Sequence, residues 1–287
     1  RRGGASLTLS ATLGAPAGSD EAIGGIRIGR QATVGVDPGQ SITLLGKDIE
    51  VDGGLYAWGG NVTLDVPRLA TAVADGYGSS EPGVIRIGSE AVIDVAARSA
   101  IAVDRLGRRY GIVADGGTIA IGGGLDWEDT GSAKAADAFI VIETGALLDA
   151  SGTQATFDIS STMGMPSITT QVVSDGGTII AKSNVGLYLD GTVKAEAGGQ
   201  GAAGGTLGLA LESAGYRVGE APSDLLRPRE FLLSQQQRES LFPEGFGVNG
   251  DYGGLVAGTG YLGADRIKAG GFDNVSLLVN GALSFDG

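Results

Sequence analysis

The feature that most constrains the fold of this sequence is a recurring pair of apolar residues two positions apart. The pairs return about every eight residues, first as Ile26/Ile28, Val34/Val36, Ile42/Leu44 and Ile49/Val51, and then as Ile85/Ile87, Ile93/Val95 and Ile101/Val103. A spacing of two places both side chains on the same face of a β-strand. The interval is too short for a helix between strands, so tight turns must join them. The intervening Gly, Asp-Gly and Asp-Pro-Gly residues suit such turns.

A longer period, in which two glycines precede a β-strand, is superimposed on the first. Gly-Gly pairs of this kind occur at 3–4, 59–60, 116–117, 176–177 and 204–205. Three strands of about eight residues would form a coil of roughly 20–25 residues, within the range of repeat architectures. We therefore predict an all-β fold, a parallel β-helix (a solenoid) with about three short strands per coil. The alternatives are a β-sandwich, which would show longer alternating strands, and a β-propeller, with a period near 40 residues.

The rhythm of short strands divides the chain into coils and inserts. Coils are expected over residues 1–211 and again over 251–287, with loops inserted near 125–138 and 152–170. Residues 212–250 form the longest interruption and are interpreted as an extended insert. Long inserts in a solenoid are usually functional or pack along its side.

The extended insert contains the one segment whose composition favours a helix. Gln, Arg, Glu and Leu dominate residues 229–241, and Gly is absent there. These are strong helix formers, so a short helix is predicted at 229–241. Pro243 and Gly245 would then end it.

Composition removes much of enzyme chemistry. The 287 residues contain no Cys and no His, which excludes Ser-His-Asp triads, thiol nucleophiles, disulfides and zinc sites built on those ligands. Asp and Glu outnumber Lys and Arg by 33 to 20, a balance that argues against nucleic acid or an anionic membrane as main partner. No apolar run approaches 18 residues, so membrane insertion is not expected. The chain begins Arg1-Arg2 without an initiator Met, and we expect a processed product or a piece of a longer protein.

Several phrases of the sequence resemble one family of large proteins. They are the Gly-Gly-Thr-(Ile/Leu) repeats, the run Leu189–Val193 followed by residues 197–207, and the closing Ala-Gly-Gly-Phe-Asp phrase within residues 264–277. Together they are similar to filamentous-haemagglutinin-type exoproteins, and the similarity extends over most of the chain. That resemblance implies a right-handed β-helical rod segment of a Gram-negative surface adhesin. Such a protein would be exported by two-partner secretion, through an outer-membrane transporter partner, and act in adhesion, aggregation or biofilm formation. The resemblance carries over no catalytic residue, so no enzymatic activity is expected.

The densest acidic group is a candidate calcium site. Asp126, Glu128 and Asp129 place three carboxylates within four residues, and Ca²⁺ takes six to eight oxygen ligands. Trp127 beside them could stack on a sugar ring. The alternative is a solvated acidic loop, and neither an EF-hand loop nor a nonapeptide calcium repeat is present. No other cofactor is expected.

Two aromatic residues form the second candidate site. Tyr56 and Trp58 could make an exposed platform for a glycan on an extracellular polysaccharide or a surface receptor. The alternative is that they cap the core at a coil corner. A related hypothesis places the inserts at 125–138 and 212–250 side by side, where Trp127 and the predicted helix would bind a glycan.

Paired carboxylates are the only acid–base chemistry that the composition permits. Asp94, Asp104 and Asp149 each adjoin an apolar strand, with Arg98 or Arg105 nearby, and two carboxylates could cleave a polysaccharide. Acidic residues at strand ends are equally ordinary turn residues. The basic run at 105–109 is interpreted in the same way, as a turn whose arginines pair with local acids.

Overall fold

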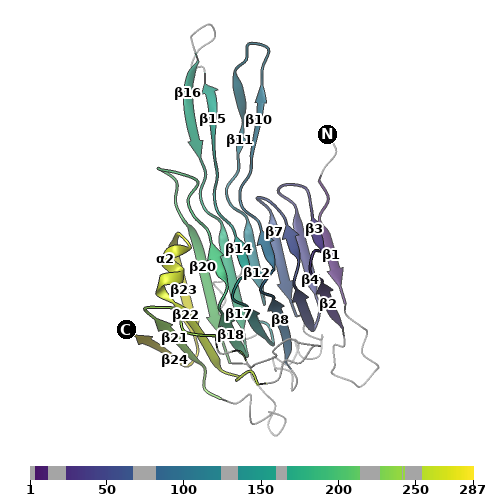
Figure 1. Cartoon of the computed structure of the whole chain (residues 1–287), viewed down its shortest axis with the longest axis vertical. Coiled ribbons are helices and arrows are strands. Elements are labelled where there is room, and N and C mark those ends of the chain that lie inside the picture. Colours follow the sequence, from purple (N-terminus) through teal and green to yellow (C-terminus); the bar gives the residue numbers. More distant parts are fainter. Residues whose placement is uncertain are drawn as a thin grey trace.

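The computed structural model describes residues 4–11, 24–66, 82–123, 135–159, 167–213, 227–240, 242 and 254–287. Nearly all regular structure in these ranges is β-strand, which confirms the all-β prediction. Three long sheets, called here sheets A, B and C, contain only parallel neighbours. They stack strand upon strand from the N-terminal to the C-terminal end of the chain (Figure 1).

Sheets A and B run the whole length of the stack, and sheet C is shorter. Sheet A consists of β1 (Leu7–Ser10), β4 (Ser41–Leu45), β7 (Asn61–Asp65), β12 (Thr118–Ile121), β17 (Thr178–Ser183), β20 (Gly205–Leu211) and β23 (Phe272–Val279). Sheet B consists of β2 (Gly25–Ile28), β5 (Asp48–Val51), β8 (Gly83–Ile87), β13 (Ala138–Ile142), β18 (Gly186–Leu189), β22 (Thr259–Gly263), β21 (Glu230–Ser234) and β24 (Ala282–Asp286). Sheet C consists of β3 (Thr33–Gly35), β6 (Gly54–Tyr56), β9 (Val92–Asp94), β14 (Leu147–Asp149) and β19 (Thr192–Lys194).

The chain visits the three sheets in a constant order. From β1 to β19 it passes five times through one strand of sheet A, one of sheet B and one of sheet C. Each return to sheet A is in register with the preceding strand, as for Ile42 with Val62 and Val62 with Ile119. This arrangement of long parallel sheets is compatible with a parallel β-helix or another solenoid. The first of these two intervals has the expected coil length, and the second is much longer because it contains inserts.

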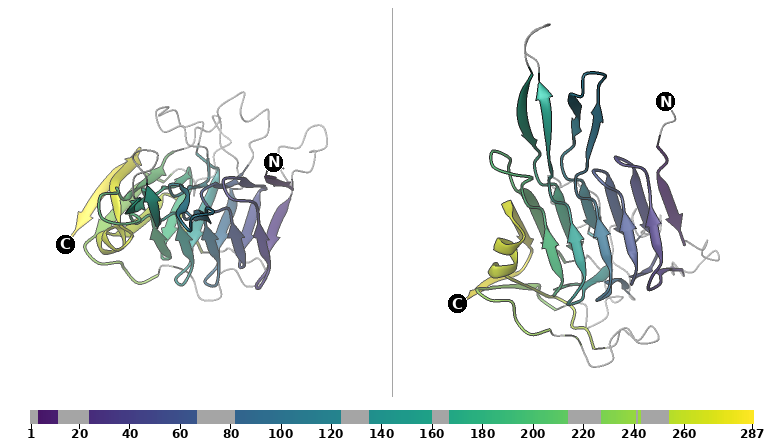
Figure 2. Two further views of the ribbon diagram at one scale, coloured as in Figure 1. Left: turned by 90° about the horizontal axis from the view of Figure 1, so that it is seen from above. Right: turned by 45° about the horizontal axis from the view of Figure 1, so that its top comes forward.

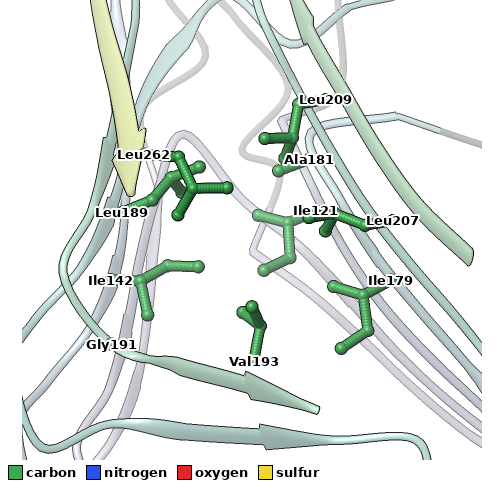
Figure 3. A pocket seen from close by; sticks show the side chains of 10 residues that line it. All are labelled: Ile121, Ile142, Ile179, Ala181, Leu189, Gly191, Val193, Leu207, Leu209 and Leu262. Atoms are coloured by element: carbon green, nitrogen blue, oxygen red, sulfur yellow. The ribbon is translucent and has the colours of Figure 1, made fainter. Parts of the chain in front are cut away.

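The inward faces of the three sheets share one apolar core. Ile42 of sheet A, Ile49 of sheet B and Leu55 of sheet C are all fully buried in the same cluster. Aliphatic side chains from the three sheets surround an interior void of about 10 Å³ near the C-terminal end (Figure 3). Its lining is apolar and gives an ordered water molecule no polar partners. It is therefore a packing defect of the core and offers no ligand site.

Glycines mark the corner at which the chain enters sheet A. The pairs at 59–60, 116–117, 176–177 and 204–205 precede β7, β12, β17 and β20, with the second glycine of the last pair opening β20. A Cβ at Gly117 would lie 2.0 Å from the carbonyl oxygen of Gly60, and one at Gly177 would lie 1.9 Å from that of Gly117. Successive turns of the chain therefore approach too closely here for any side chain.

Two antiparallel hairpins leave the stack between sheet C and sheet A. The first pairs β10 (Ser99–Val103) with β11 (Arg109–Val113), and the second pairs β15 (Gln154–Ile159) with β16 (Ile168–Val173). They project side by side beyond the sheets (Figures 1 and 2). The predicted loop at 152–170 is thus largely a hairpin. The expectation that Ile101 and Val103 form a coil strand is wrong, because they lie in β10 and are 52% and 61% exposed.

The prediction of a helix at 229–241 is also wrong for the described residues. Residues 230–234 form β21, which lies between β22 and β24 in sheet B, and residues 235–240 are irregular. Phe231 of β21 is buried in the common core, and Leu233 packs against it. Pairing on both edges and burial of this alternating face outweigh the helix propensity of the segment.

The same segment and the residues just after it also pack on the outer face of sheet B, at the end of the sheet formed by the C-terminal part of the chain. Tyr188, Tyr261 and Val141 are buried there against Leu232 and Phe242. Arg229 is only 1% exposed, and its Nε donates to the carbonyl oxygen of Glu212 at 2.9 Å. The described part of the predicted insert therefore belongs to the stack.

The last turn of the chain differs from the others. After β22, a short helix α2 (Ala264–Ala269) stands where a strand of sheet C would follow. Ile267 packs against the core, and the amide of Ala195, just beyond β19, donates to the carbonyl oxygen of Gly270 at 2.8 Å. This helix, which no sequence signal predicted, covers the edge of sheet C. Sheets A and B continue past it with β23 and β24.

Candidate functional site

The outer face of sheet C brings together side chains from four successive turns of the chain. Tyr56, Asp94, Asp149 and Lys194 occupy equivalent positions in β6, β9, β14 and β19 and are in register with one another. The preceding residue of each strand points into the core, so these four side chains point outward. The row thus runs across the strands, parallel to the axis of the stack.

An aromatic and charged cluster lies at one end of this row. The indole Nε1 of Trp58 donates to Oδ2 of Asp94 at 3.0 Å, and Nη2 of Arg98 donates to the same oxygen at 2.9 Å. The guanidinium carbon of Arg98 lies 5.1 Å from the centre of the Trp58 ring, in cation–π geometry. Tyr56 meets Trp58 edge to face, with ring centroids 6.2 Å apart. Two residues from one turn and two from the next therefore form a single contact network.

Local backbone structure explains why Asp94 and Asp149 hold their places. Oδ1 of Asp94 accepts a hydrogen bond from the amide of Ala96, and Oδ1 of Asp149 accepts one from the amide of Ser151, both at 2.9 Å. Each aspartate thereby caps the turn that ends its strand. The interpretation of these carboxylates as turn residues is supported, and both still face solvent in part.

The cluster consists of the ion pair between Asp94 and Arg98 and the ring of Trp58, which contacts both. The side chain of Asp94 is 14% exposed and that of Arg98 is 51% exposed, so the pair lies at the edge of solvent. Asp94 accepts hydrogen bonds from Ala96, Trp58 and Arg98, which compensates the cost of its partial burial. An apolar ring beside polar groups with fixed directions is the chemistry with which proteins bind sugars and other amphipathic ligands.

Of the predicted catalytic carboxylates, Asp94 and Asp149 lie side by side on neighbouring strands. Asp104 is elsewhere, in the turn of the first hairpin, where it accepts hydrogen bonds from the amides of Leu106 and Arg108 and from Nε of Arg108. The backbone and guanidinium hydrogen bonds of Arg108 lower the pKa of Asp104. A carboxylic acid with a lowered pKa is poorly suited to be a general acid.

Two arginines of the basic run at 105–109 form ion pairs, one within the turn and one with the second hairpin. Arg108 pairs with Asp104, as expected for a turn. Arg109 pairs with Asp158 of the second hairpin through both Nε and Nη2, each at 3.1 Å. The prediction that arginines of this run pair with local acids is confirmed for Arg108, whereas the partner of Arg109 is an acid of another hairpin, distant in the sequence.

The candidate calcium ligands Asp126, Glu128 and Asp129, and Trp127 beside them, lie outside the described residues. Within the described ranges, no three acidic side chains gather closely enough to hold a metal ion. No helix in those ranges has both the length and the apolar character needed to span a bilayer.

The sequence identified Tyr56 and Trp58 as candidate glycan contacts, and Asp94 with Arg98 as candidates for polysaccharide cleavage. The structure places all four together. Lys194 was missed. A signal was present, because Tyr56, Asp94, Asp149 and Lys194 each follow an inward-facing apolar residue at the end of a short strand. Equal positions in the repeat become neighbours when the turns stack.

No protein-family model, curated protein or solved structure matches the chain.

Proposed function

We propose that this chain is a right-handed parallel β-helix that serves as a rod segment of a large secreted bacterial adhesin. The observation that carries the proposal is the constant order in which the chain passes through sheets A, B and C from β1 to β19, with parallel neighbours within each of these sheets. Each return to a sheet is a strand–crossover–parallel strand connection, and these connections are right-handed in about 98% of cases.

A stack of this kind suits a mechanical role. Each turn adds about 4.8 Å of length and is stabilised mainly by its two neighbours. The sequence resemblance to filamentous-haemagglutinin-type exoproteins supports the same role, with export through an outer-membrane transporter and a final place at the cell surface. The chain requires no catalytic group to perform it.

The native size and location of the polypeptide test this proposal. We expect intact-mass measurement of the native polypeptide that carries this sequence to give a species far larger than 28.7 kDa. Cell fractionation should find it at the cell surface. A free mature species near 28.7 kDa, or one retained inside the cell, would contradict the rod proposal.

Polysaccharide binding by sheet C is a second candidate function. It is favoured by the convergence of Trp58, Tyr56, Asp94 and Arg98, which pairs aromatic rings with directed hydrogen-bonding groups. We expect Trp58→Ala to weaken binding to a panel of uncharged polysaccharides about tenfold in affinity electrophoresis, since a stacked ring contributes ~1 kcal/mol or more. Tyr110→Ala is the matched control, because Tyr110 is an exposed aromatic on the first hairpin. Equal losses in both variants would point away from sheet C.

The cleavage alternative is tested with the same panel. Release of reducing ends that disappears in both Asp94→Asn and Asp149→Asn would favour a cleaving enzyme over a binding module. Binding without any such release would leave the surface as a binding site only.

A further inference from the structure

The outward row on sheet C extends well beyond the aromatic cluster. Tyr56, Asp94, Asp149 and Lys194 follow one another on four adjacent parallel strands. Adjacent strands lie about 4.8 Å apart, so the row covers roughly 14 Å along the axis of the stack. A single sugar ring on Trp58 would use only one end of it.

The chemistry of the row changes along its length while its charge stays nearly balanced. Arg98 compensates Asp94, with an N–O distance of 2.9 Å, and Nζ of Lys194 lies 3.7 Å from a carboxylate oxygen of Glu196. At Asp149, the Oδ1 atom accepts the hydrogen bond from the amide of Ser151 that caps the turn. Along the axis of the stack, the row therefore offers first aromatic rings, then the carboxylate of Asp94 with the guanidinium of Arg98, then the carboxylate of Asp149, and last the ammonium group of Lys194.

Charge indicates what kind of ligand fits this row. The chain carries a net charge of −13, which opposes the approach of a polyanion. The paired charges within the row leave no excess of positive charge to overcome that repulsion. Hydroxyl groups both donate to carboxylates and accept from guanidinium and ammonium groups, so an uncharged, hydroxyl-rich chain is complementary.

We propose that sheet C binds an uncharged, extended polysaccharide lengthwise, with its chain crossing β6, β9, β14 and β19. The inference rests on the polysaccharide-binding function proposed above. Trp58 and Tyr56 contact one end of the bound segment, and Asp149 and Lys194 are binding residues further along. A straight β-1,4-linked chain suits a straight row, because one sugar unit is comparable in length with one strand spacing.

Length dependence of the affinity tests this geometry. Isothermal titration would use oligomers of two to six units of β-1,4-linked glucose, mannose, xylose and N-acetylglucosamine. In at least one series we expect the affinity to rise with each unit up to about four, and then to level off, because the row has four strand positions, one for each unit.

Two variants locate the far end of the bound chain. Asp149→Asn and Lys194→Met should each weaken binding of the longest oligomers about tenfold, since a hydrogen bond to a charged group contributes ~1.5 kcal/mol. Both should leave binding of the two-unit oligomers unchanged. Lys268→Met on α2, where Lys268 is exposed, is the matched control and should change neither.

The outcomes separate this inference from the function on which it rests. Affinity that is already maximal at two units and depends on Trp58, with no effect of the Asp149 and Lys194 variants, would overturn lengthwise binding but keep a local sugar site. Failure of all four series to bind would overturn both.

Discussion

At the scale of single residues, the glycines of the sheet A corner are the clearest case of a residue type required by its neighbours. Gly60, Gly117 and Gly177 occupy equivalent positions of successive turns, and a Cβ added to Gly117 or Gly177 would lie 2.0 or 1.9 Å from the carbonyl oxygen of the glycine in the turn before. The amide of Thr118 donates to the carbonyl oxygen of Gly60 at 2.9 Å, and the amide of Thr178 donates to that of Gly117 at the same distance. The Gly-Gly phrase of the sequence is thus a consequence of contact between successive turns of the chain.

Substitution of Gly117 by Ala should destabilise the stack. The new Cβ would lie 2.0 Å from a backbone carbonyl oxygen, so the two turns must move apart. We expect a loss of about 2 kcal/mol or more in the free energy of unfolding, measured by urea denaturation. Gly29→Ala is the control, because nothing lies within 4 Å of its added Cβ, and it should change stability by less than about 1 kcal/mol. Equal effects of the two substitutions would contradict the contact argument.

At the scale of elements, the two hairpins show how one sequence pattern serves two structures. Ile101 and Val103 have the same spacing as the core pairs, yet they belong to a projecting hairpin. A spacing of two records only that both side chains share a face of a strand. Whether other residues cover that face depends on where the chain turns. Here Gly107, with φ of 78°, helps the chain to reverse its direction between β10 and β11, so both strands project away from the core.

The contact between the hairpins should depend on Asp158. Hydrogen bonds from Arg109 and Thr169 hold the pKa of Asp158 well below its usual range. The contribution of a carboxylate with a depressed pKa is complete above its unfolded-state value near 4 and is lost as the pH falls through the folded value. We therefore expect Asp158→Asn to speed amide hydrogen exchange in β10, β11, β15 and β16 at pH 7. The difference between variant and parent should shrink only below about pH 4.

The readout for the hairpins is hydrogen exchange followed by mass spectrometry. Strands of sheet A, such as β7, provide the internal control and should exchange at the parent rate. Faster exchange throughout the chain would mean that Asp158 acts on the whole fold, and an unchanged rate in the hairpins would mean that the ion pair does not hold them together.

At the scale of the whole molecule, the core is continuous from turn to turn and ends where the stack ends. Central residues such as Ile85 are fully buried between turns, whereas Val34 on the edge strand of sheet C is only partly buried. In a stacked architecture, stability is roughly a sum of each turn and its contacts with its neighbours. The central turns therefore contribute most.

Truncation of core side chains should reveal this gradient. We expect Ile85→Ala to lower the free energy of unfolding by about 3 kcal/mol. Val34→Ala should cost about 1 kcal/mol or less, because its cavity opens toward the end of the stack. Urea denaturation followed by circular dichroism measures both. A larger loss for Val34→Ala than for Ile85→Ala would contradict a core that is strongest at its centre.

The sequence by itself indicated the strand content and the pattern of short strands, because the alternation of side chains acts within a few neighbours. It also marked the glycine corners, but the reason for glycine there is contact between successive turns of the chain. It also singled out Tyr56, Trp58, Asp94 and Arg98 as chemically notable. Only the tertiary structure decided that Phe231 lies in a strand, since two neighbouring strands outweigh local helix propensity. Likewise, only stacking brought Trp58 to Asp94, because contact between residues of different turns depends on insert lengths that no local pattern records.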